Sequence, residues 1–141
     1  MASLLYNSFK KKIMDGSIDL DTDTIKIALV SSAYTPDKDA HDFWDDVVAN
    51  EVANSGTYTA GGATLTPTVS QDNTDDEGVF DATDVSWTSA TITARYAVIY
   101  KSTGVNSTSP LIAVIDFGTN QISTGGTFAI TFAAEGIINL N

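Results

Sequence analysis

The chain has 141 residues, of which 43% are hydrophobic and 18% are charged. This length and composition predict one globular domain, residues 1–141, and exclude a collagen-like or disordered chain. Cysteine is absent, which excludes disulfides, thiolate metal ligands and cysteine nucleophiles. Eighteen acidic residues against seven basic ones give a net charge of −11, which disfavours binding to nucleic acid or to an anionic membrane.

The N-terminal segment predicts a helix over residues 3–15. Apolar residues recur at helical spacing, and Asp15-Gly16 supplies a stop signal. Three consecutive lysines lie near the C-terminal end, where the helix dipole favours cations. Apolar residues precede the basic ones, the reverse of a secretion signal, and no apolar run reaches the roughly 20 residues that a membrane-spanning helix needs.

Two further elements are predicted before the composition changes. Ile25, Ile27 and Leu29 alternate with polar or small residues, which indicates a strand with one buried face. A second, short helix is expected from Asp39, as its N-cap, to about Val52, because acidic residues crowd its start and apolar side chains lie one turn apart.

From Asn54 onward the sequence predicts β structure. The chain contains 19 threonines, and its Thr, Ser, Gly and β-branched residues form short runs separated by turn residues. The pattern favours a mainly β fold, a β-sandwich or a barrel-like antiparallel sheet, with two short N-terminal helices, α+β by strict count. The expected strands are Gly62 to Val69, Val79 to Phe80, Val85 to Thr88, Ala90 to Lys101, Pro110 to Phe117, Thr127 to Phe132 and Ile137 to Leu140.

The apolar runs 94–100 and 111–115 are expected to form a hairpin in the core, covered on both faces. The intervening polar stretches, Gln71 to Gly78, Ser102 to Ser109 and Gly118 to Gly126, are expected to be turns.

The residues offer little catalytic chemistry. His41 is the single histidine, and neither a Gly-x-Ser-x-Gly nucleophile elbow nor a phosphate-binding loop is present. His41 is therefore expected to be structural, and the chain is expected not to be an enzyme.

Two acidic runs contain the oxygen ligands that a calcium site would need. The run Asp19 to Asp23 lacks the glycine and the bidentate glutamate of a calcium-binding loop, since Thr24 and Val30 stand at those positions. The second run is expected to be a solvated turn, with a weak Ca²⁺ site as the alternative, and no other cofactor is expected. Its acidic residues are Asp72, Asp75, Asp76 and Glu77.

Arg95 is the only arginine and lies inside an apolar run. It is expected to form a structural ion pair with one of the acids, with a subunit contact or a catalytic role as alternatives. The aromatic residues Tyr34, Phe43, Trp44 and Tyr58 are expected in the core or at an interface. Trp44 in particular is expected to contact a partner, because its helix has more apolar circumference than one face buries.

Several blocks of the chain resemble a small virion structural protein common in tailed bacteriophages. The blocks are Tyr34 to Val52, Tyr58 to Leu65, Ala94 to Lys101 and Ser109 to Gly118, within a resemblance that runs from Leu5 to about Leu140. It implies a capsid decoration, or cement, protein on the outer surface of the virion, made in the bacterial host cytoplasm. It further implies a homotrimer that bridges subunits of the major capsid protein, and it brings no catalytic residues.

The segment 1–16 is the expected contact with the capsid or with another subunit, because it holds the only concentrated positive charge. The alternative is a solvated helix packed on its own domain. The expected contact residues are Leu4, Leu5, Phe9, Lys10, Lys11, Lys12 and Trp44.

Two other functions stay open at this point. A tail, neck or fibre-adaptor protein would share the virion context and the β-rich composition. A carbohydrate-binding module would use exposed aromatics, here Trp44, Trp87 and Tyr58, to stack on sugars.

Overall fold

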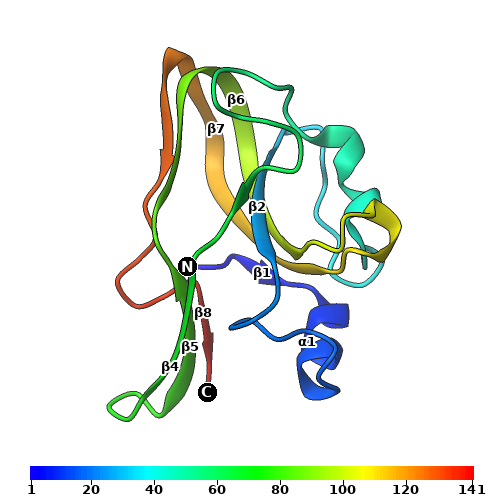
Figure 1. Ribbon diagram of the computed structural model, residues 1–141, viewed down its shortest axis with the longest axis vertical. Coiled ribbons are helices and arrows are strands. Elements are labelled where there is room, and N and C mark those ends of the chain that lie inside the picture. The colour runs from blue at the N-terminus through cyan, green and yellow to red at the C-terminus, as the bar shows by residue number, and fades with distance from the viewer.

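The computed structural model describes residues 1–141 and shows two antiparallel sheets (Figure 1). The strand order is β1-β7-β6-β2-β3 in the five-stranded sheet and β4-β5-β8 in the three-stranded sheet. The strands are β1 (Leu4–Leu5), β2 (Ile25–Val30), β3 (Ala63–Thr64), β4 (Pro67–Asp72), β5 (Glu77–Ala82), β6 (Val85–Lys101), β7 (Leu111–Ile130) and β8 (Ile138–Leu140). The prediction of a mainly β, antiparallel fold is confirmed, but the larger sheet ends in separate edge strands and does not close into a barrel.

The hairpin of β6 and β7 is the main scaffold of the fold. Its two strands have 17 and 20 residues, and they merge the four strands that the sequence predicts over 85–132 into two. The polar stretch 118–126 is therefore strand and not a turn. Because Ala94 pairs with Gln121 and Tyr96 with Asp116, residues 117–120 of β7 lie opposite Arg95 alone. This bulge absorbs the polar break, and together with two further register shifts between Trp87 and Ile92 it bends the hairpin.

The bend brings the two halves of the hairpin face to face. In Figure 1 the strands rise from the yellow loop at the right, bend over at the top and descend on the left. Trp87 and Phe128, on the descending half, are buried at 3% and 6% exposure. The Trp87 ring meets that of Tyr58 edge-on at 5.2 Å between centroids, so aromatic packing joins the descending half of the hairpin to the loop that contains Tyr58.

The N-terminal helix is shorter than predicted. α1 spans Asn7–Met14, while Leu4 and Leu5 form β1 and pair with β7. The amides of Ser3 and Tyr6 donate hydrogen bonds to carbonyls of β7, which explains the difference, because an exposed strand edge competes with the first turn of the helix.

The predicted second helix, Asp39 to Val52, is wrong. The segment contains two single-turn 3-10 helices, η1 (Trp44–Asp46) and η2 (Val48–Asn50). The Asp46 carboxylate accepts hydrogen bonds from the amides of Asp42 and Phe43, and the Trp44 amide donates to the carbonyl of Ser109 next to β7. Side-chain and sheet-edge hydrogen bonds therefore replace helical ones.

The three-stranded sheet extends away from α1 at the lower left of Figure 1. β4 and β5 form a hairpin around the turn 73–76, and β8 pairs with β5. The strand predicted from Gly62 to Val69 is split into β3 and β4, because the Leu65 amide bonds to the carbonyl of Ile25 before the chain changes sheets. No helix of the structure is long and apolar enough to cross a membrane.

Candidate functional site

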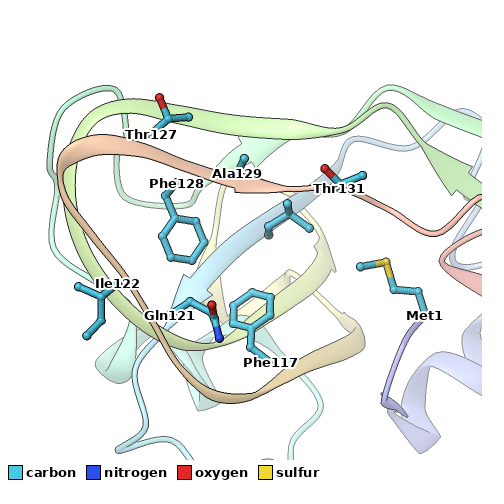
Figure 2. Close-up of a pocket in the computed structure, with 9 residues that line it drawn as sticks. Met1, Phe117, Gln121, Ile122, Thr127, Phe128, Ala129 and Thr131 are labelled. Carbon is cyan, nitrogen blue, oxygen red and sulfur yellow. The ribbon is translucent and has the colours of Figure 1, made fainter.

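A hollow of about 380 Å³ lies inside the bend of β7 (Figure 2). Phe117 points into it from one arm of the strand and Phe128 from the other, with 6.1 Å between the ring centroids. Met1 lies at one end, and Ile122 at the bend is 69% exposed. The lining includes no acidic or basic side chain, so this site is suited to apolar contact.

The outer edge of β7 is covered only over its first residues. The Trp44 amide donates to Ser109, the amides of Ser3 and Tyr6 donate to β7 carbonyls, and the Ser3 hydroxyl accepts from the Asp116 amide. Between residues 118 and 131, no backbone hydrogen bond joins β7 to a segment other than β6. The strand therefore has an open edge next to the hollow.

Helix α1 presents the basic residues on an anchored scaffold. Tyr6 and Phe9 are fully buried, whereas Lys10 and Lys11 are exposed. Lys11 forms an ion pair with Asp15 at 3.0 Å. Hydrogen bonds from Ser17 and Lys11 lower the pKa of Asp15 to about 2. Lys12 lies 5.0 Å from the centre of the Phe43 ring, a cation–π contact that ties the helix to the loop before η1.

Only some of the residues expected to contact a partner are exposed in the fold. Lys10 and Lys11 are exposed, and Leu4, Leu5 and Lys12 are partly buried. Phe9 and Trp44 are buried in their own chain, at 0% and 2% exposure. Their assignment as contact residues is corrected, because a side chain in the core leaves no surface for a partner.

Of the aromatic residues expected in the core or at an interface, Tyr34, Trp44 and Tyr58 are buried, and each has a different ring as its neighbour. Trp44 stacks on Tyr100, Tyr58 meets Trp87, and Tyr34 lies against His41. Trp44, Trp87 and Tyr58, the residues proposed to stack on sugars, are at most 3% exposed. The expectation that these aromatics are exposed is therefore wrong. None of the three rings named for the carbohydrate-binding alternative is accessible to a sugar.

His41 belongs to a chain of hydrogen-bonded side chains. The Tyr6 and Tyr34 hydroxyls are 2.7 Å apart, and the Tyr34 hydroxyl lies 2.9 Å from Nδ1 of His41. Burial raises the pKa of Tyr34 to about 12. These hydrogen bonds link the start of α1 to the loop after β2.

Arg95 pairs with Asp116 across the bulge of the main hairpin. Nε of Arg95 donates to Oδ1 at 2.7 Å, and the second guanidinium contact, to Oδ2, is 3.2 Å. This pairing lowers the pKa of Asp116 and raises that of Arg95. The Gly118 amide donates to the same carboxylate, so the pair fixes the bend of β7.

Glu51 is a site residue that the sequence did not indicate. Its carboxylate accepts hydrogen bonds from the Tyr58 hydroxyl at 2.8 Å and the Gly61 amide at 2.6 Å. The Tyr58 hydroxyl accepts in turn from the Leu29 amide. Partial burial raises the pKa of Glu51. The network holds the 51–62 loop on the edge of β2.

The second acidic run forms the β4–β5 turn. Asp72 accepts hydrogen bonds from the amides of Thr74 and Asp75, which lowers its pKa. Glu77 turns toward β8 and accepts a hydrogen bond from the Asn139 side chain. No group of three or more His, Asp or Glu side chains is placed to hold a metal ion.

Comparison of the chain with protein-family models, with curated proteins and with solved structures finds no match.

Proposed function

We propose that the chain is a non-enzymatic structural protein of a tailed-phage virion that decorates the outside of the capsid and bridges subunits of the major capsid protein. The starting point is the resemblance of four ordered blocks, whose last two form the central strands of the fold. A protein that binds the assembled shell in preference to free subunits stabilises that shell by mass action.

The observation that carries this proposal is the exposed, anchored pair of cations on α1. Lys10 and Lys11 project from a helix fixed by the buried Phe9, in a chain with a net charge of −11. An acidic protein that binds an acidic capsid surface needs a local patch of opposite sign to reduce the repulsion. Of the seven basic residues, three lie consecutively on this helix.

The direct test is sedimentation of the protein with empty shells. The proposal expects the protein to pellet with shells and to saturate at a stoichiometry that matches the capsid lattice. The double variant Lys10→Gln, Lys11→Gln is expected to weaken binding several-fold and to reduce its dependence on salt, because two screened charge contacts are lost.

A matched control is the double variant Asn73→Asp, Thr74→Asp. It changes the net charge by the same amount, in the β4–β5 turn, which lies far from α1 in Figure 1. The control is expected to bind shells as the parent protein does. If the parent protein ignores shells, the decoration role is wrong. A few copies per virion, instead of a lattice-like number, would favour the tail, neck or fibre-adaptor role.

A further inference from the structure

The open part of the β7 edge differs from the edges of β2, β6, β4 and β8. The edge of β2 is covered by β3, by the Val52 amide, which donates to the Leu29 carbonyl, and by the Tyr58 hydroxyl, which accepts from the Leu29 amide. The first half of β6 is covered by Ser55 and Thr57, which bond to Thr91 and Thr88. The remaining edge from 118 to 131 has no such cover.

The edges of the smaller sheet have features that discourage pairing with another chain. β8 has three residues. β4 has six, beginning with Pro67 and ending with Asp72, and both proline and charge at an edge oppose strand addition. The open segment of β7 is longer and contains neither proline nor charge, although the bulge at 117–120 lies at its start. An unprotected strand edge of this kind is a template for another strand.

The charge distribution singles out the same segment. Residues 117–134 contain no Asp, Glu, Lys, Arg or His, in a chain with 18 acidic and seven basic residues. Ile122 is 69% exposed in this stretch and adjoins the apolar hollow of Phe117 and Phe128. Protein interfaces show this depletion of charge in their centres.

We infer that the open edge of β7, residues 118–131, together with its apolar hollow, is the surface through which one copy of this chain binds a second copy. The net charge of the chain indicates that the partner at this surface is a second copy. Two chains with a net charge of −11 repel each other over most of their surfaces, and like charges placed across an interface oppose association. A neutral surface is where two such copies meet with the least repulsion, whereas a basic partner would gain more at the acidic turns.

The inference rests on the proposed function only in that a decoration protein is expected to assemble from several copies, and its test requires no shell. Light scattering and sedimentation over a range of concentrations measure the mass of the full chain. The parent protein is expected to exceed the monomer mass. Ile122→Glu is expected to weaken self-association at least about tenfold, because it puts a carboxylate in the contact.

The matched control is Val105→Glu, which places the same charge at another exposed β-branched residue, 56% exposed in the loop between β6 and β7. It is expected to associate as the parent does. Both variants are expected to retain the far-ultraviolet circular dichroism spectrum and the melting temperature of a folded chain, since both positions are on the surface.

Hydrogen exchange supplies a measurement that needs no substitution. Amides of 118–131 that point away from β6 are expected to gain protection as the protein concentration rises. A monomeric parent protein, equal effects of the two variants, or exchange at 118–131 that does not depend on concentration would overturn the inference. A monomer that still pellets with shells would leave the decoration role intact, and an oligomer that ignores shells would remove that role while the inference stands.

Discussion

Trp44 stacks on Tyr100, with ring centroids 4.4 Å apart and ring planes at 8°. Trp44 lies in η1, and Tyr100 lies at the end of β6, so the stack fastens the loop after β2 to the central hairpin. The Trp44 amide also donates to Ser109 next to the start of β7. The side chain and the backbone of Trp44 thus hold in place a segment that forms no α-helix.

Trp44→Ala is expected to destabilise the fold by about 3–5 kcal/mol, the range for truncation of a buried large aromatic residue. Trp44→Phe, which keeps a ring above Tyr100, is expected to cost less. Urea unfolding followed by circular dichroism measures both, since the loss of Trp44 alters the fluorescence signal. An unchanged midpoint for Trp44→Ala, combined with lost binding to a partner, would instead restore Trp44 as a contact residue.

Alanine substitutions at Gly62 and Gly104 allow the cost of steric overlap to be distinguished from the cost of backbone strain. Both have positive φ, +72° and +85°. A Cβ on Gly62 would overlap the Ile27 carbonyl oxygen and lie 2.7 Å from Cα of Ala28, whereas one on Gly104 would meet nothing within 4 Å. Gly104→Ala is expected to cost about 1–2 kcal/mol, from strain alone.

Gly62→Ala is expected to cost clearly more, about 3 kcal/mol or above, because backbone of β2 must also move. Thermal unfolding of the two variants and the parent protein gives the comparison. Equal losses of stability at the two positions would show that the distance between residue 62 and the β2 backbone is larger than in the structure.

The central hairpin was predictable because its apolar runs, 94–100 and 111–115, are unbroken and flank a polar loop. The rest of β6 and β7 was not, since the glycines and polar residues of 118–126 have turn chemistry. Whether such residues form a turn or a bulged strand depends on a partner far along the chain, here residues 90–94 of β6. The helix predicted over residues 39–52 was wrong for a similar reason, because backbone amides of this segment donate to the Asp46 carboxylate and to the Ser109 carbonyl.

The candidate site shows the same limit. The exposed lysines of α1 could be identified from composition, because the triplet is the only cluster of positive charge. The open edge of β7 could not, because only the strand pairing shows that β1 covers β7 at Ala113 and Val114 and leaves residues 118–131 without a neighbour on that side. The sequence around Glu51 did not indicate a site residue. Glu51 is partly buried because the 51–62 loop folds back and places Tyr58 and Gly61 against it.

The Arg95–Asp116 ion pair is expected to add a modest, pH-dependent stabilisation. The pKa of Asp116 is lowered in the folded chain, chiefly by the Arg95 hydrogen bond. Its stabilising effect is therefore present above the ordinary aspartate pKa and is lost as the pH falls through the folded-state pKa. Both side chains are partly exposed, at 29% and 37%, so Asp116→Asn is expected to cost about 1 kcal/mol or less at neutral pH.

The loss is expected to shrink in acid and in high salt, and urea midpoints at two pH values and two salt concentrations measure it. Asp45→Asn is the control, an exposed acid for which the structure shows no side-chain hydrogen bond. A cost for Asp116→Asn that does not depend on pH would mean that the Gly118 contact, and not the charge on Asp116, holds the bulge.

Glu51 is expected to have the opposite dependence on pH. Burial raises its pKa in the folded chain, so the folded state binds this proton more tightly than the unfolded chain does. The contribution of Glu51 to stability is thus fully present below the ordinary glutamate pKa and is lost as the pH rises through the folded-state pKa. Glu51→Gln, which keeps an oxygen for the Tyr58 and Gly61 donors, removes this dependence.

The unfolding free energy of Glu51→Gln, relative to that of the parent, is therefore expected to increase as the pH rises from below the ordinary glutamate pKa through the higher pKa of Glu51 in the folded chain. Tyr58→Phe tests the cause from the other side of the hydrogen bond. The Tyr58 hydroxyl lowers the pKa of Glu51, so its removal is expected to move the titration of Glu51 to higher pH. It also leaves the Leu29 amide without its acceptor and is expected to cost about 1–3 kcal/mol. A difference between Glu51→Gln and the parent that stays constant with pH would show that water reaches Glu51 and that its burial does not govern the loop.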